Sequence, residues 1–265
     1  MFDKLLLAVD PSKRLKPARE YAIALSEKLE VPLVAAFISN PKKAGTSTAS
    51  LDTTDGFTAL GKRQLKQIVD ANKSIKIKPI IKRGKRHKVL AKMVDDGIGD
   101  TLILGPFRSY LSRLFTGSEV ERILEYESSH AFVVRNEHPL PGPGSPALVV
   151  VDGNDFSDKA ISSIEDFARK FGCDIELLYL GKNRINTDFM DSTVISLRER
   201  LGEKYHITST IIPHSFFKSR KAITNSVAVA EGARIVVLPV IGHLVSEFLL
   251  HQVVLDASVP VCVIR

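Results

Sequence analysis

Short apolar runs alternate with helical patterns along the whole chain. The first half predicts strands near residues 4–9, 31–38, 75–82, 101–105 and 131–135. Between the first two runs, apolar residues recur at helical spacing, at Ala18, Tyr21, Ala22, Leu25 and Leu29. Buried strands separated by single amphipathic helices are typical of a parallel sheet with helices on both faces.

The second half repeats this order. Its predicted strands lie near 147–151, 175–180, 207–213, 234–238 and 260–264, and its predicted helices near 157–171, 188–203, 218–231 and 244–257. Both halves open on an apolar strand that ends in Val-Asp, in LLLAVDPS (5–12) and ALVVVDGN (147–154). We therefore predict a duplicated α/β unit, with Gly172 and Gly232 at helix C-termini.

A proline-rich segment separates the two halves. Residues 136–146 read NEHPLPGPGSP, with four prolines and two glycines. Proline removes backbone donors and stops strands, so this composition indicates a semi-rigid connector. We predict a first domain over 1–136, a linker over 137–146 and a second domain over 147–265.

Composition excludes several classes of protein. No apolar run approaches the roughly 18 residues that a membrane span needs, and the first ten residues do not resemble a signal peptide. Cys173 and Cys262 lack the spacing of a metal site, and the histidines show no ligand pattern. These features predict a cytoplasmic protein without a metal site or a membrane segment.

The net charge of +7 is unevenly distributed. Residues 1–144 hold 24 Lys+Arg against 16 Asp+Glu, which gives +8, and residues 145–265 hold 13 against 14, which gives −1. Seven of the basic residues lie in IKIKPIIKRGKRHK (75–88). This stretch fits either a docking site for RNA or another anion, or an edge strand that lysines protect from pairing. Nucleic acid is not the favoured partner, because no aromatic residues are interleaved.

Three features of the first half lie where a parallel sheet binds ligands, beyond the carboxyl ends of its strands. Asp10 ends the first strand, and Gly105 directly follows the fourth, where the absence of a side chain allows a close backbone approach. Gly117 and Ser118 open the last helix, whose free amides can bind an anion. Structural roles are also open: Asp10 in a turn, and Ser118 with Glu121 in a capping box. No phosphate loop, GxGxxG, HExxH or GxSxG motif is present.

These residues resemble the universal stress protein family, in two copies that cover nearly the whole chain. LLLAVDPS, the strand DTLILG (100–105) and GSEVERILEYESSHAFVVR (117–135) carry the resemblance. It implies two tandem open-sheet domains, each a five-stranded mostly parallel sheet of the Rossmann-like, adenine nucleotide alpha-hydrolase-like class. The nucleotide-binding members carry G-x2-G-x9-G-[S/T] after the fourth strand. The resemblance therefore implies a nucleotide site at Asp10, Phe37 (through its backbone), Gly105, Gly117 and Ser118, and we add Arg108 from the same loop as a candidate.

The two copies depart from that motif to different degrees. In the first, Arg108 replaces the second glycine and the following spacer is one residue short; Arg108 could pair with a phosphate or fill the space. In the second, Pro239 replaces the first glycine, and Glu247-Phe248 stand where Gly117-Ser118 stand. A carboxylate at that helix start repels phosphate, so we predict that the second domain does not bind a triphosphate.

The resemblance implies a stress-response regulator whose first domain binds ATP or AMP, with Mg²⁺ only alongside ATP. The sequence supplies no evident general base or metal pair, so slow ATP hydrolysis is the most activity we expect. One alternative is a nucleotide-free scaffold for protein interactions, and another is binding of RNA or an anion through 76–88. The resemblance also implies that the two domains pair within one chain through their last strands, AFVVR and VCVIR, as a pseudo-dimer. A further homodimer stays open.

Overall fold

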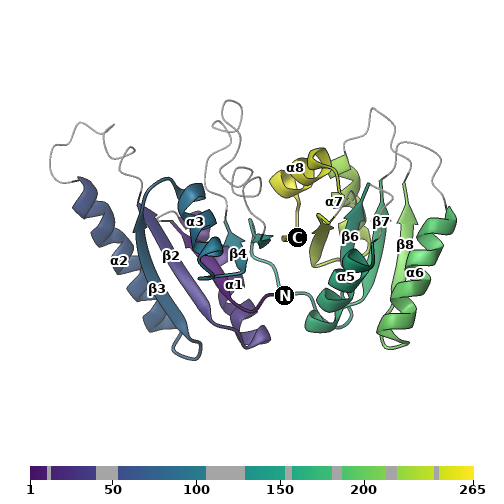
Figure 1. Cartoon of the computed structure of the whole chain (residues 1–265), viewed down its shortest axis with the longest axis horizontal. Helices are drawn as coiled ribbons and strands as arrows, with labels where there is room; N and C mark the ends of the chain where they lie inside the picture. The colour runs from purple at the N-terminus through teal and green to yellow at the C-terminus, as the bar shows by residue number, and fades with distance from the viewer. Residues whose placement is uncertain are drawn as a thin grey trace. The chain divides into compact units, whose positions relative to one another are not determined.

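The computed structural model describes residues 1–10, 13–39, 53–105, 129–152, 157–180, 187–212, 220–241 and 245–265. The chain divides into two compact units, unit 1 (Met1–Glu137) and unit 2 (His138–Arg265), and each is an α/β structure (Figure 1).

Unit 1 is built on a parallel sheet. Its strands are β1 (Leu5–Val9), β2 (Leu33–Ser39), β3 (Ile77–Arg83), β4 (Thr101–Leu104) and β5 (His130–Val133). They are arranged in the order β3-β2-β1-β4-β5. The described helices are a 3-10 turn, η1 (Lys13–Leu15), followed by α1 (Lys16–Leu29), α2 (Thr53–Ala71) and α3 (Arg86–Asp95).

Unit 2 has the same strand order. Its strands are β6 (Ala147–Val151), β7 (Ile175–Tyr179), β8 (Ile207–Ile211), β9 (Ile235–Pro239) and β10 (Val261–Ile264), with parallel order β8-β7-β6-β9-β10. Its described helices are α5 (Asp158–Phe171), α6 (Thr187–Leu201), α7 (Arg220–Ala230) and α8 (Glu247–Asp256). The predicted α/β class with mostly parallel sheets is therefore confirmed.

The hydrophobic pattern explains this architecture. The central strands β1, β4, β6 and β9 are buried along their whole length, as expected for a sheet covered on both faces. In unit 2, α5 packs beside α6 and α7 packs beside α8. Right-handed crossovers place these two pairs on opposite faces of the sheet, because the chain moves one way from β6 to β8 and returns for β9 and β10.

The ends of the helices follow local chemistry. Pro17 lies in the first turn of α1, where its missing N–H costs nothing. Ser157 caps α5, and Gly172 ends it with a φ of 62°. Gly232, with a φ of 64°, follows α7 by two residues. Strand β3 begins at Ile77 instead of residue 75, because the Ile75 N–H belongs to a turn that starts at Asn72.

The proline-rich segment contains an ordered turn. The Ser145 N–H donates to the Gly142 carbonyl at 3.1 Å, and the Ser145 hydroxyl donates to the same oxygen at 2.9 Å. Pro143 and Gly144, the latter with a φ of 73°, occupy the central positions, as a type II turn requires. This turn over 142–145 belongs to unit 2, which begins at His138.

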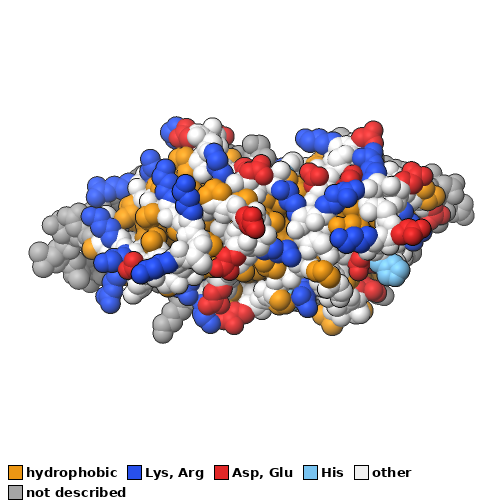
Figure 2. All heavy atoms as spheres, turned by 90° about the horizontal axis from the view of Figure 1, so that it is seen from below, with side chains coloured by type: hydrophobic (Ala, Val, Ile, Leu, Met, Phe, Trp, Pro, Cys, Tyr) orange, Lys and Arg blue, Asp and Glu red, His pale blue; other side chains and the backbone are white. Residues whose placement is uncertain are grey.

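The uneven charge of the chain is visible on its surface. Figure 2 shows Lys and Arg side chains gathered on the half that holds unit 1, and mixed signs on the half that holds unit 2. Among the helices of the described residues, none is long and apolar enough to cross a membrane.

Candidate ligand site at the carboxyl edge of each sheet

The strand order of unit 1 reverses at β1, which pairs with both β2 and β4. Ligands of open α/β sheets bind in the crevice beyond the carboxyl ends of the strands at such a reversal. Asp10 follows β1 directly, and its side chain is buried, with a relative exposure of 6%. A buried carboxylate at this edge is the first element of a candidate site.

Gly105 lies at the same edge, directly after β4. A Cβ added there would lie 3.3 Å from the Cβ of Ala18 and 3.5 Å from Leu15 Cδ1. The small size of Gly105 therefore allows the end of β4 to approach the start of α1. Close packing is therefore a structural reason for glycine at position 105, in addition to the predicted close approach of a ligand.

The backbone of Phe37 lies close to Asp10 and Gly105. It pairs in register with Val9 of β1, the residue before Asp10. On the other side of β1, Leu7 pairs with Ile103 of β4, and this register continues to place Gly105 beside Val9. Its side chain packs under α2, where a Cβ on Gly61 would lie 2.4 Å from the Phe37 ring. Its backbone is thus positioned at the edge, and the contact of that backbone with a nucleotide remains a prediction. The fold brings Asp10, Phe37 and Gly105 together.

The other predicted residues of this site, Arg108, Gly117 and Ser118, lie outside the described residues. Their roles, like the capping box at Ser118 and Glu121, remain predictions.

At the corresponding edge of unit 2, the strand-end carboxylate is bonded to the start of a helix. Asp152 follows β6 as Asp10 follows β1. Its carboxylate accepts a hydrogen bond from the Ser246 N–H at 2.7 Å and another from the Ser246 hydroxyl at 2.5 Å. Ser246 is the N-cap of α8, and its hydroxyl also accepts from the Leu249 N–H at 3.3 Å. A carboxylate of the chain therefore lies at the positive end of this helix.

Tyr179 completes this cluster at the end of β7. Burial raises the pKa of its hydroxyl, and the nearby negative charge of Asp152 raises it further. The phenol accordingly stays neutral beside the carboxylate at physiological pH.

The sequence located this helix start only in part. Glu247 is the first residue of α8, which confirms a carboxylate in its first turn. The sequence reasoning missed Ser246 and its bonds to Asp152, although a serine immediately before a helical pattern is a known capping signal. Pro239 ends β9, paired with Ile264, and does not follow the strand as Gly105 does.

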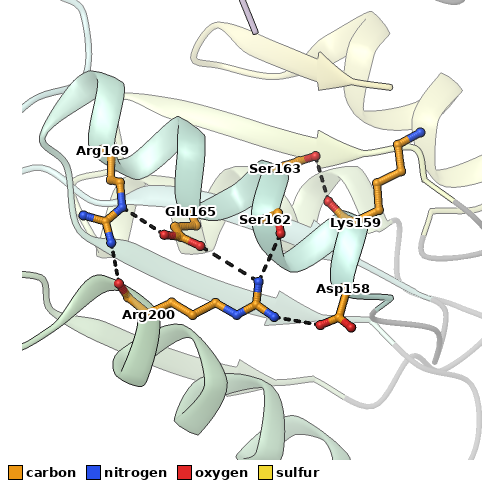
Figure 3. A network of polar contacts seen from close by, with 7 residues as sticks. All are labelled: Asp158, Lys159, Ser162, Ser163, Glu165, Arg169 and Arg200. Carbon is orange, nitrogen blue, oxygen red and sulfur yellow. Dashed lines mark hydrogen bonds and ion pairs between the residues drawn. The ribbon is translucent and has the colours of Figure 1, made fainter.

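A second polar cluster of unit 2 has a structural role. Arg200 of α6 donates to Asp158 at 2.7 Å and to the Ser162 hydroxyl at 3.0 Å, both on α5 (Figure 3). Arg169 of α5 donates to Glu165 and to the Arg200 carbonyl oxygen. The network joins two neighbouring helices on the surface. Across the described part of the chain, no group of three His, Cys, Asp or Glu residues is placed to hold a metal ion.

The fold and the position of this edge define the class of protein: an α/β protein of the adenine nucleotide alpha-hydrolase-like fold. Residues 1–135 match the model of the universal stress protein family. The chain therefore belongs to the universal stress protein family. No curated protein matches the sequence.

Solved structures extend the similarity of fold to both units. A universal stress protein from Archaeoglobus fulgidus DSM 4304 aligns over 99% of this chain and 96% of its own, with a TM-score of 0.75 and 15% identity. A functionally unknown protein from Pseudomonas aeruginosa PAO1 covers 99% and 92%, with a TM-score of 0.59 and 13% identity. The cytoplasmic domain of a prokaryotic cation chloride cotransporter covers 99% and 95%, with a TM-score of 0.57 and 12% identity.

Proposed function

We propose that this universal stress protein binds one adenine nucleotide per chain, in unit 1, and that unit 2 does not bind a triphosphate. The bonds from Ser246 to Asp152 carry the proposal of asymmetry. They engage both the strand-end carboxylate and the helix start that a nucleotide would need. In unit 1, the buried Asp10 beside Gly105 and the Phe37 backbone supports a site for ribose and base.

Each residue has a distinct role in the proposed site. The Asp10 carboxylate accepts from ribose hydroxyls, and the Phe37 backbone faces the base. Gly117 and Ser118 supply amide and hydroxyl donors for the phosphates, and Arg108 pairs with one of them. Mg²⁺ accompanies ATP alone, because oxygens of neighbouring phosphate groups chelate it and AMP has a single phosphate group. The protein would act as a switch that the nucleotide biases toward one conformation, in a cytoplasmic setting.

The test is a titration calorimetry experiment on the full chain with ATP, AMP and cyclic AMP. We expect one site per chain. Asp10→Asn should weaken binding by roughly tenfold or more, since it removes a charge-assisted bond. The matched control is Asp152→Asn in unit 2, which should leave the affinity unchanged. No heat with any nucleotide, or two equal sites per chain, would overturn the proposal.

The scaffold hypothesis is tested by one substitution with a different readout. Gly117→Asp places a carboxylate at the predicted phosphate site. It should abolish nucleotide binding in our proposal, and it should leave partner binding intact if the chain is a nucleotide-free scaffold.

The basic stretch is better explained by the edge of the sheet than by an anion site. It maps to β3, the last strand in the order of unit 1, and to the start of α3. Lys78 and Lys82 are exposed on that strand. Lysines on an edge strand oppose unwanted strand pairing. RNA binding would instead weaken steeply with salt, and replacing Lys82, Arg83, Lys85 and Arg86 would abolish it.

A further inference from the structure

The two units differ at the strands that end their sheets, β3 in unit 1 and β8 in unit 2. On β3, the Lys76 carbonyl accepts from Leu33 and the Gly84 N–H donates to Ser39, so even-numbered residues bond toward β2. Pro79 therefore faces outward, where it presents no N–H. With the exposed Lys78 and Lys82 beside it, this edge is closed to a further strand.

The edge of β8 has the opposite character. The His206 carbonyl accepts from the Ile175 N–H at 2.9 Å, and the Ile212 N–H donates to Tyr179 at 3.0 Å. Even-numbered residues thus bond toward β7, and the N–H and C=O of Ser209 point outward. Ser209 is exposed, and no bond to its backbone is recorded among the described residues.

Ser209 occupies the position of Pro79 in the matching strand. Pro79 pairs with Ala35, which pairs with Leu7, and Ser209 pairs with Leu177, which pairs with Val149. Unit 2 therefore keeps a backbone donor at the one outward position where unit 1 has none.

The sequence of β8 is complementary to itself. Ile207–Ile211 reads ITSTI, the same in both directions. An antiparallel pair of two such strands centred on Ser209 places Thr208 opposite Thr210 and Ser209 opposite Ser209. The strand itself carries no charged side chain, so it lacks the repulsion that lysines on β3 would cause between two copies.

Arg198 adjoins this edge and is compatible with pairing. Its guanidinium donates to the outward carbonyl of Ile207 at 2.8 Å. A carbonyl oxygen has two lone pairs, so it can accept from Arg198 and from a second strand together.

We propose that two copies of this chain associate through antiparallel pairing of β8 about a two-fold axis at Ser209. The contact is isologous, because both copies contribute the same strand, and it leaves neither β8 edge open. A single strand pair buries less area than a stable interface, so the association is weak, with a dissociation constant on the order of 10–100 µM.

Sedimentation velocity on the full chain, over about 5–500 µM, tests this association. Ser209→Pro introduces the residue that unit 1 has at this position and keeps all hydrogen bonds to β7. Ser209→Lys keeps the outward N–H donor but places two like charges opposite each other in the dimer. Each should raise the dissociation constant at least about tenfold. Glu203→Lys is the matched control, an exposed charge change outside the strand that should leave it unchanged. Circular dichroism verifies that each variant is folded.

A disulfide test reports the register directly. Opposed Cα atoms of a hydrogen-bonded antiparallel pair lie about 5.5 Å apart, within the reach of a disulfide. Ser209→Cys should therefore form a covalent dimer on mild oxidation, whereas Glu203→Cys should not. Cys173 and Cys262 are fully buried and do not compete. A chain that stays monomeric to the highest concentration, a dimer that both Ser209 variants leave intact, or no cross-link at Ser209 would each overturn the proposal.

Discussion

At the scale of single residues, small side chains decide how closely helices approach the sheets. Gly61 lies in the middle of α2, a position where glycine costs helix stability, and its value lies in the contact with Phe37. The sequence contains this glycine but does not reveal its partner, because Phe37 lies 24 positions away. The same holds for Gly105 and Ala18, which lie far apart in the sequence and pack together only in the folded unit.

Gly61→Ala should destabilise unit 1. A Cβ there would lie 2.4 Å from the Phe37 ring, so the ring or the helix must shift. We expect a loss of about 1–3 kcal/mol in the free energy of unfolding, even after the gain in helix propensity. Gly56→Ala, in the same helix with no atom within 4 Å of the added Cβ, is the control and should stabilise by up to about 1 kcal/mol. Equal effects at the two positions in urea denaturation would contradict the packing argument.

Cys262 makes stability depend on alkaline pH. Complete burial raises the pKa of its thiol well above the ordinary value. A raised folded-state pKa of an acid means that the unfolded chain releases its proton first. The stabilisation is therefore complete below the unfolded-state pKa of about 8.5, and it is lost as pH rises above it. The raised pKa of Tyr179 acts in the same direction nearer pH 10.

The denaturation midpoint should accordingly decrease as the pH is raised from 7 to 10.5. In Cys262→Ala, the decrease that begins near pH 8.5 should be smaller. Thiol reagents should label Cys173 and Cys262 only at the rate of unfolding, since both are buried. Rapid labelling of the native protein at pH 8 would contradict the burial.

At the scale of elements, the helix starts differ in what they bind. Ser157 caps α5 with a single bond from the Ala160 N–H at 3.4 Å. Ser246 caps α8 and also donates twice to Asp152, so α8 is fastened to the end of β6. A capping serine can be predicted from the sequence. The hydrogen bonds to Asp152, which lies 94 positions earlier, depend on the strand order.

Ser246→Ala should therefore cost more than Ser157→Ala. Removing a cap alone costs about 1 kcal/mol. Ser246→Ala also removes the hydroxyl donor to the Asp152 carboxylate, so we expect about 2–3 kcal/mol in total. Chemical denaturation of both variants measures the difference. Two equal losses would show that the bond to Asp152 contributes nothing.

The Arg200 network should contribute little to stability. Its members are partly exposed, and solvent screens such pairs. Arg200→Ala should lower the free energy of unfolding by about 1 kcal/mol or less at low salt, and by less again at 1 M salt. A loss that did not depend on salt would indicate that the packing of the aliphatic stem between α5 and α6, and not the charge, stabilises the pair.

At the scale of the whole molecule, one fold appears twice with different edges. Unit 1 has the buried Asp10 at its ligand edge and Pro79 on its outer strand. Unit 2 bonds Asp152 to Ser246 at the matching edge, and its outer strand β8 has no lysine or proline. Our two proposals follow from this contrast, with ligand binding in unit 1 and self-association in unit 2.

Hydrogen exchange should separate the two units. Saturating ATP should protect the amides around β1, β2 and β4 and leave β6, β7 and β9 unchanged, because a ligand stabilises the part of the protein that binds it. Asp10→Asn is the control that should remove this protection. Equal protection of both units would contradict the asymmetry.

The sequence by itself determined the strand and helix pattern, the α/β class and the position of Asp10 and Gly105 at strand ends. These features depend on hydrophobic period and on neighbouring residues, which are local. Only the tertiary structure decided that Ser246 bonds to Asp152, that Gly61 accommodates Phe37 and that Ser209 replaces Pro79 at an outer edge. Each of those depends on strand order and register, which join residues that lie far apart in the chain.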